Sequence, residues 1–214
     1  MDDLKQQLQA IRSLEVLPME ESQKLDITSV KKGGFIELNN DTWQITNYYS
    51  YLDVKWKDFS QRKKDYWVIE LELYSLTKGT KTFVEWEIDD ELEICLTDAL
   101  IKLRDIQYDG KSLTRKDIAY IEDEEEGEIK YKGAKYFYSD DDTWAGLFFK
   151  NANDAKNKTN SIPLRMYEFE SDDGQYLSIE SWHENEDKAE REAFVSHSIK
   201  STDIRVLQMS GQLN

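Results

Sequence analysis

The chain is 214 residues long and carries 44 acidic against 28 basic side chains, a formal net charge of −16. This balance excludes a protein that holds nucleic acid or an anionic membrane by bulk electrostatics, because both need a basic surface, and we expect no direct contact with nucleic acid. Aromatic residues make up 12% of the chain, enough to build a hydrophobic core beside a charged content of 34%.

Cysteine content and the N-terminus bear on compartment and cofactors. Cys95 is the only cysteine, which excludes a disulfide framework and a zinc site built on several thiolates. The N-terminus lacks the basic segment and apolar run of a signal peptide, and no run of about 18 apolar residues occurs. We therefore expect a cytoplasmic protein without a transmembrane segment and without a cofactor.

The N-terminal segment predicts an amphipathic helix over residues 3 to 15. Its apolar residues recur every three or four positions, at Leu4, Leu8, Ile11 and Leu14, and Pro18 follows. This stripe is expected to pack on the body of the protein, and docking on a partner is the alternative.

From Ile27 onward the pattern indicates antiparallel β-strands. We predict strands at 35–38, 42–51, 67–76 and 80–88, with turns at 39–41 and 78–79 and a further short strand after Glu91. In 67–76, apolar residues such as Ile69 alternate with polar ones such as Glu70, which is typical of a strand with one dry face and one solvent face. An exposed Lys-rich loop is expected around 53–65.

The second half repeats this pattern at an offset of about 93 to 95 residues. Residues 128–138 resemble the first hairpin, and residues 163–182 resemble the second strand pair, although chance similarity between strand-rich segments is an alternative. We predict a mainly β, β-rich α+β fold of duplicated antiparallel sheet units with an N-terminal amphipathic helix. The expected units are the helix and connector at 1–26, a first repeat at 27–110 and a second, acidic repeat at 111–214. Residues 98–105 and 185–193 are compatible with short helices.

Four strand motifs resemble a known family. They are Gly34-Phe35-Ile36-Glu37-Leu38, Thr42-Trp43-Gln44-Ile45, Tyr66-Trp67-Val68-Ile69-Glu70 and Phe83-Val84-Glu85-Trp86-Glu87. Over about residues 30–206 the chain resembles the bacterial domain of unknown function 4178. This resemblance implies a β-rich cytoplasmic bacterial domain, and it carries over no activity and no catalytic residues.

Residues suited to catalysis are few. His183 follows a predicted strand, and with Glu180 and Glu184 it forms the one weak candidate set for acid–base chemistry. No nucleophile elbow or phosphate-binding loop is present, and Cys95 lies between two apolar residues, as a buried cysteine does. The sequence therefore favours a protein that is not an enzyme.

Clustered aspartates are weak candidates for a metal site. Asp140, Asp142, Asp172 and Asp173 could supply oxygen ligands to Ca²⁺ or Mg²⁺. The calcium-loop template fails, because Ala145 stands where it requires glycine when Asp140 is its first position. Aspartates in predicted turns more commonly bond the local backbone, so we predict no metal site.

The negative charge is concentrated in two segments of the second half. Residues 117–142 hold ten acids and three bases, and residues 168–192 hold ten acids and two bases, which together give −15 of the −16. A solvated surface that aids solubility is one interpretation, and a surface for a cationic partner is the other. The residues assigned to this partner surface are Glu122, Glu124, Glu125, Glu126, Asp141, Glu186 and Asp187.

These patterns predict a non-enzymatic binding or accessory module whose acidic second half contacts a basic protein or a polyamine. One alternative is a small-ligand enzyme with a pocket between the repeats. The other is an immunity or regulatory protein for a basic partner.

Overall fold

The computed structural model of the chain describes residues 2–183 and 190–211. Its helices are α1 (Asp2–Ser13), α2 (Met19–Ser22), α3 (Arg115–Glu124) and α4 (Ala152–Asn157), with 3-10 turns η1 (Ile27–Ser29), η2 (Leu103–Asp105) and η3 (Ser201–Asp203). Its strands are β1 (Phe35–Leu38), β2 (Asp41–Lys55), β3 (Asp58–Ser75), β4 (Lys81–Ile88), β5 (Leu92–Ile101), β6 (Gln107–Tyr108), β7 (Lys111–Ser112), β8 (Glu128–Tyr131), β9 (Ala134–Phe149), β10 (Ile162–Glu170), β11 (Gln175–Trp182), β12 (Glu190–Ser198) and β13 (Ile204–Gln208). The predicted β-rich fold class with an N-terminal helix is confirmed.

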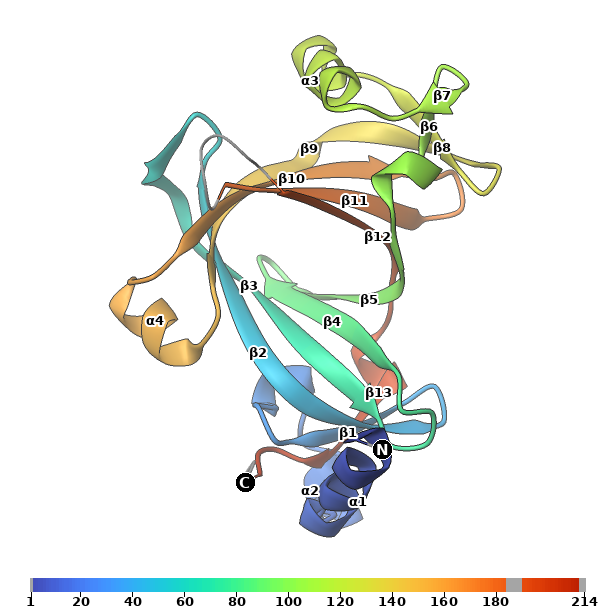
Figure 1. Cartoon of the computed structure of the whole chain (residues 1–214). Coiled ribbons are helices and arrows are strands. Elements are labelled where there is room, and N and C mark those ends of the chain that lie inside the picture. The colour runs from blue at the N-terminus through green and yellow to red at the C-terminus, as the bar shows by residue number, and fades with distance from the viewer. Residues whose placement is uncertain (1, 184–189, 212–214) are drawn as a thin grey trace.

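The strands of the described residues form one antiparallel sheet that closes into a barrel. β2, β3, β4 and β5 continue through β12, β11, β10 and β9, and β9 pairs with β2 to complete a ring of eight strands. Figure 1 shows the two four-stranded arcs facing each other, β2 to β5 below and β9 to β12 above. One face of every barrel strand therefore points into an enclosed interior, which we call the lumen.

The strand order is the same in the two halves. The hairpin β1–β2 leads into β3, β4 and β5, and the hairpin β8–β9 leads into β10, β11 and β12. Both hairpins turn through positive φ angles, at Asn39 and Asn40 in the first and at Lys132 and Gly133 in the second, as two-residue hairpin turns require. β13 returns to pair with β1 in the first half. A common origin of the halves, and the boundary between 110 and 111, stay predictions.

Two hydrophobic cores lie on the outer side of the barrel wall. The first packs β3, β4 and β5 against β1, β13 and η1, and it includes Ile36, Leu71 and Val206. The second packs α3 against strands β8 to β12 and includes Ile121 and Phe169. Each fully buried side chain of this size contributes about 1.5–3 kcal/mol. A third buried cluster, which includes Val68 and Met166, lies on the lumen side, so the lumen is partly apolar and partly polar.

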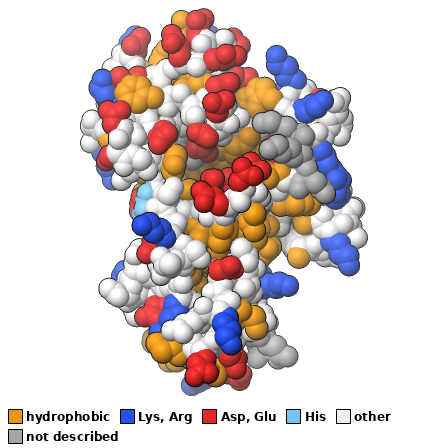
Figure 2. Space-filling model, turned by 180° about the vertical axis from the view of Figure 1, so that it is seen from behind, with side chains coloured by type: hydrophobic (Ala, Val, Ile, Leu, Met, Phe, Trp, Pro, Cys, Tyr) orange, Lys and Arg blue, Asp and Glu red, His pale blue; other side chains and the backbone are white. Residues whose placement is uncertain are grey.

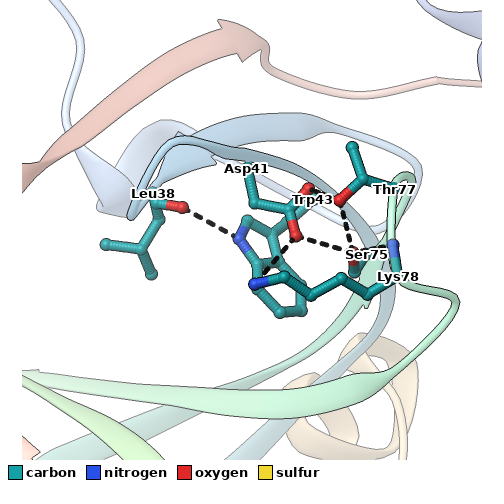
Figure 3. Close-up of polar contacts among 6 residues, drawn as sticks. All are labelled: Leu38, Asp41, Trp43, Ser75, Thr77 and Lys78. Carbon is teal, nitrogen blue, oxygen red and sulfur yellow. Dashed lines mark hydrogen bonds and ion pairs between the residues drawn. The ribbon is translucent and has the colours of Figure 1, made fainter.

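A buried carboxylate joins the first two hairpins. Asp41, only 3% exposed, accepts hydrogen bonds from Ser75 Oγ and Thr77 Oγ1, both at 2.7 Å, and Lys78 Nζ lies 3.7 Å away (Figure 3). Burial disfavours the ionised carboxyl, but the hydroxyl donors outweigh it and lower the pKa of Asp41. The indole of Trp43 donates to the Leu38 carbonyl across the same turn at 3.1 Å.

The N-terminal helix packs differently from the prediction. Ala10 is buried against Phe35, whereas Leu4, Leu8 and Ile11 are 62%, 45% and 52% exposed. The expectation that the leucine stripe packs on the body is wrong for these three residues, because the contact is made by a neighbouring face of the helix. No helix in residues 2–183 or 190–211 is long and apolar enough to cross a membrane.

Three local expectations also differ from the structure. Residues 190–193 begin β12 and are not helical, because all four pair with β11 and Ala193 also pairs with Ile101 of β5. Residues 53–65 are mostly strand, since β2 runs to Lys55 and β3 begins at Asp58. The segment 98–105 divides between the end of β5 and the short turn η2.

Candidate functional site

A pocket of about 440 Å³ lies in the barrel lumen, and all eight barrel strands contribute to its wall. Nine of its described lining residues are acidic, and we call them the pocket acids: Asp53, Glu70, Glu85, Glu87, Asp89, Glu93, Asp141, Asp142 and Glu168. No described lining residue is a lysine, arginine or histidine. The volume falls within the range of about 300–1,000 Å³ that is typical of small-ligand sites. Figure 2 shows acidic side chains gathered around a hollowed, largely hydrophobic area on the face opposite to that of Figure 1.

Strand alternation places these carboxylates. In β3, Ile69 and Leu71 face the first core, so Glu70 between them faces the lumen. In β4, Val84 faces the same core and Glu85 faces the lumen. The expectation that this polar face lies in bulk solvent is wrong, because closure of the barrel encloses it.

Strand register brings like charges directly opposite one another. Glu70 of β3 pairs with Glu85 of β4, and Glu87 of β4 pairs with Glu93 of β5. Side chains directly opposite in an antiparallel sheet have Cβ atoms about 4.5–5.5 Å apart, at which like charges repel. On the other arc Glu180 of β11 pairs with Glu192 of β12.

These surroundings raise the proton affinity of the carboxyls. Burial, followed by the nearby Glu70 and Glu87, raises the pKa of Glu85 to about 8. Burial, followed by the neighbouring Glu192, raises the pKa of Glu180 to about 8. Glu85 is half-buried, and it lines the pocket.

Two further carboxyls behave in the same way. Burial raises the pKa of Glu70 well above its ordinary value, with Glu180 as the next cause, although a hydrogen bond from Tyr51 opposes the rise. Burial also raises the pKa of Glu168 well above its ordinary value, and Ser178 Oγ donates to this carboxyl at 2.7 Å. Each of these hydroxyl donors stabilises the carboxylate, but at both residues burial outweighs it.

A neighbouring glutamate shows how a nearby cation changes the pKa of a buried carboxyl. Glu72 follows Glu70 on β3 and is 8% exposed, but Lys81 Nζ lies 2.7 Å from its carboxylate. Burial opposes ionisation there, yet the hydrogen bonds from Lys81 and Thr46 lower the pKa of Glu72. Glu70, Glu85 and Glu168 have no such cation among the described residues that line the pocket.

Aromatic rings complete the pocket wall. Tyr66, Trp144, Tyr176 and Phe194 line it. Trp144 meets Tyr51 edge to face at 6.0 Å and lies over Gly146, where an added Cβ would stand 2.5 Å from the indole ring. Aromatic faces attract cations, so acids and rings together favour a positively charged organic ligand.

Comparison with known proteins identifies the family. The sequence matches the family described as "Domain of unknown function (DUF4178)" over residues 31–201. The chain belongs to this family. An uncharacterised protein of Aquifex aeolicus (strain VF5) is 30% identical over 181 residues, which cover 79% of this chain and 82% of that protein. No solved structure matches.

Two residues of the predicted acid–base set, Glu180 and His183, lie on opposite sides of the barrel wall in the DUF4178 chain. Glu180 is 4% exposed and accepts a hydrogen bond from Trp182 Nε1 at 3.0 Å on the lumen side. His183 stacks on Phe59 at 5.7 Å beside Arg165, on the outer side of the barrel. Burial, followed by the nearby arginines, lowers the pKa of His183. Glu184 lies outside the described residues.

The predicted metal ligands of the DUF4178 chain lie in two places. Asp140 and Asp142 are in β9, where Asp142 lines the pocket and accepts from Ser139 Oγ at 2.6 Å. Asp172 and Asp173 are in the turn between β10 and β11, where Asp173 accepts from Ser171 Oγ at 2.6 Å. Within residues 2–183 and 190–211, no three acidic, histidine or cysteine side chains converge for a metal ion.

The predicted partner surface is spread over several positions. Glu122 accepts from Trp56 Nε1 at 2.8 Å and from Tyr167 OH at 3.2 Å, so it serves internal packing. Glu125 ends α3 with a positive φ of 56°, and Asp141 lies in the pocket. Glu186 and Asp187 lie outside the described residues.

Glu124 and Glu126 line a second, shallow hollow of the DUF4178 domain. It lies among α3, β6, β8 and β9, and its rings include Tyr120 and Phe137, which are 55% and 40% exposed. Glu128 at the same hollow is neutralised by Lys130 at 3.2 Å and by Lys135.

The sequence pattern did not predict that four glutamates line the pocket. Glu70, Glu85, Glu87 and Glu168 were expected on solvent faces or counted only as part of an acidic segment. The sequence contained a signal for one of these contacts. The tight turn at Gly79 sets the register of β3 and β4, and this register places Glu70 opposite Glu85.

Proposed function

We propose that this DUF4178 protein binds a small organic cation of the polyamine class in the barrel lumen, between its two halves. The observation that carries the proposal is a pocket whose described lining holds nine acids and no lysine, arginine or histidine. Under this proposal the acidic binding site is the lumen and not the outer surface of the second half.

The charge distribution supports this proposal energetically. Carboxylates that are withdrawn from water without a cationic partner destabilise a fold by several kcal/mol. Among the described residues, no hydrogen-bond donor to Glu85 compensates this cost, and the donors to Glu70 and Glu168 are hydroxyls. A bound ammonium group replaces the missing partners, and its alkyl chain fits the aromatic wall at Trp144 and Phe194.

An extended organic cation fits better than a metal ion. The pocket acids come from several strands, and no three of the described acidic, histidine or cysteine side chains converge on one point. A metal ion needs such convergence, whereas a polyamine distributes its charge along a chain.

Isothermal titration calorimetry with spermidine tests the proposal. Glu85→Gln and Glu168→Gln keep the shape of the side chain and remove its charge. Each is expected to weaken binding about 10- to 100-fold, since a charge-assisted hydrogen bond contributes about 1.5–3 kcal/mol. Glu37→Gln is the matched control, because it removes an exposed carboxylate that pairs with Arg205 and leaves the pocket intact.

Equal affinity of the wild type and both pocket variants would refute the lumen as the site. Mg²⁺ and butylamine serve as further probes in the same experiment. Binding of Mg²⁺ at least as tight as that of spermidine would contradict the organic ligand, and binding of butylamine as tight as that of spermidine would contradict the polyamine class.

A second candidate function is the binding of a basic peptide at the hollow beside α3. Glu124 and Glu126 there have no ion pair among the described residues, and Tyr120 and Phe137 expose large ring areas. Acids beside exposed rings complement arginine-rich segments, and this is how a basic protein partner would be recognised.

Fluorescence anisotropy with a labelled arginine-rich peptide tests this second function. Glu124→Gln with Tyr120→Ala is expected to weaken binding at least tenfold, and binding is expected to weaken further as salt rises. Unchanged affinity of this double variant, or affinity insensitive to salt, would refute it.

A further inference from the structure

The lumen contains carboxyl groups that lie directly opposite one another on neighbouring strands. Glu70 and Glu85 are directly opposed across β3 and β4, and Glu87 and Glu93 are directly opposed across β4 and β5. In the Glu70–Glu85 pair, which burial withdraws from water, one shared proton is favoured over two carboxylates that repel each other.

The surroundings of these pairs offer no cation among the described lining residues. Glu72 lies two residues from Glu70 on the same face of β3 and is paired with Lys81 at 2.7 Å. The other titratable groups that face the pairs are Tyr51 and Asp53 from β2, Tyr66 from β3, Asp89 after β4, Cys95 from β5, Asp141 and Asp142 from β9, Glu168 from β10, Tyr176 and Glu180 from β11 and Glu192 from β12. All of them are neutral or negative at neutral pH. No described residue that lines the pocket supplies a positive charge to the pairs, and the proposal assigns that charge to a proton or to a ligand.

We propose that the lumen exchanges protons for its cationic ligand, so that the opposed glutamates release protons as each ammonium group enters. This inference rests on the proposed function, and it adds how the site is regulated. In each exchange a protonated Glu85 carboxyl and an ammonium ion give a Glu85 carboxylate paired with that ammonium, and one proton leaves to solvent. Charge in the lumen is conserved, since one positive charge replaces another.

The exchange makes ligand binding depend on pH. Burial and neighbouring carboxyls raise the pKa of Glu85 to about 8, so at pH 7 the empty pair holds its proton. Affinity for spermidine is then expected to rise between pH 6 and pH 8, by up to about tenfold per pH unit for each proton released. A site made of ordinary surface carboxylates is already ionised at pH 6 and shows no such rise.

Calorimetry in two buffers measures the protons directly. Spermidine is titrated into the wild-type protein at pH 7 in phosphate and in Tris, and the difference in observed enthalpy gives the number of protons released. At least about one proton per bound spermidine is expected. Replacing one pair in Glu70→Gln/Glu85→Gln is expected to lower this number by about one, and Glu37→Gln is expected to leave it unchanged.

The possible results distinguish the proton exchange from the proposed binding of a polyamine. Tight binding of spermidine with no protons released, or with the same number released by the double variant, would overturn the exchange and leave the proposed function standing. No binding of spermidine at any pH would overturn both. If the double variant does not fold, the affinity of the wild type at pH 6, 7 and 8 decides, because a constant affinity overturns the exchange.

Discussion

Removing one lumen charge should stabilise the empty protein, and the effect should grow with pH. Glu85→Gln replaces a carboxyl that makes no hydrogen bond to the described residues by a neutral group of the same shape. The folded-state pKa of Glu85, about 8, lies above the ordinary value of 4.5, so between these limits the folded protein binds more protons than the unfolded chain. Stability therefore falls as pH rises through this window, and the glutamine variant escapes the loss.

The magnitude follows from the change in proton affinity. At about 1.4 kcal/mol per unit of pKa, the rise from 4.5 to about 8 corresponds to at most about 5 kcal/mol, of which about 4 kcal/mol develops between pH 5 and pH 9. Water in the pocket screens part of this cost, so we expect about 2 kcal/mol.

Urea denaturation of ligand-free protein at pH 5, 7 and 9 measures this effect. Glu85→Gln should match the wild type within about 0.5 kcal/mol at pH 5 and exceed its free energy of unfolding by about 2 kcal/mol at pH 9. Glu37→Gln should show no such trend. A glutamine variant that is equally stable or less stable at pH 9 would refute the description of the lumen as a site of uncompensated charge.

Three further predictions concern other parts of the chain. Gly146→Ala should displace the Trp144 ring, which lies 2.5 Å from the added Cβ, and calorimetry should show spermidine affinity lowered about tenfold. Asp41→Asn should cost about 2–3 kcal/mol in urea denaturation at pH 7, and since its folded pKa is lowered from 3.8, the difference from wild type should shrink only as pH falls below that value. Leu8→Glu should change the free energy of unfolding by less than about 0.5 kcal/mol, whereas Ala10→Glu, at a buried position, should cost more than about 2 kcal/mol.

Local sequence pattern predicted the strands well, because alternation and turn chemistry act over a few residues. The hairpin at 35–51 and the strand pair around Gly79 follow from alternating apolar residues and from turn residues that accept positive φ. The helix α3 had local signals as well. Thr114 and Asp117 form a capping box, and Ile118 and Ile121 are buried one turn apart, but the charged run that follows indicated a loop.

The site itself depends on contacts between distant parts of the chain. Whether Glu70 faces solvent or a lumen is decided by the pairing of β2 with β9 and of β5 with β12, roughly a hundred residues apart. No short-range pattern contains this information, which explains why the acids were assigned to an outer surface.

The crystal structure of the protein with spermidine tests the central claim most directly. Ligand density should lie in the lumen, with ammonium nitrogens at about 2.7–2.9 Å from the carboxylates of the Glu70–Glu85 pair, and the chain of the ligand should lie against Trp144. Density at the hollow beside α3, with an empty lumen at saturating spermidine, would contradict the account.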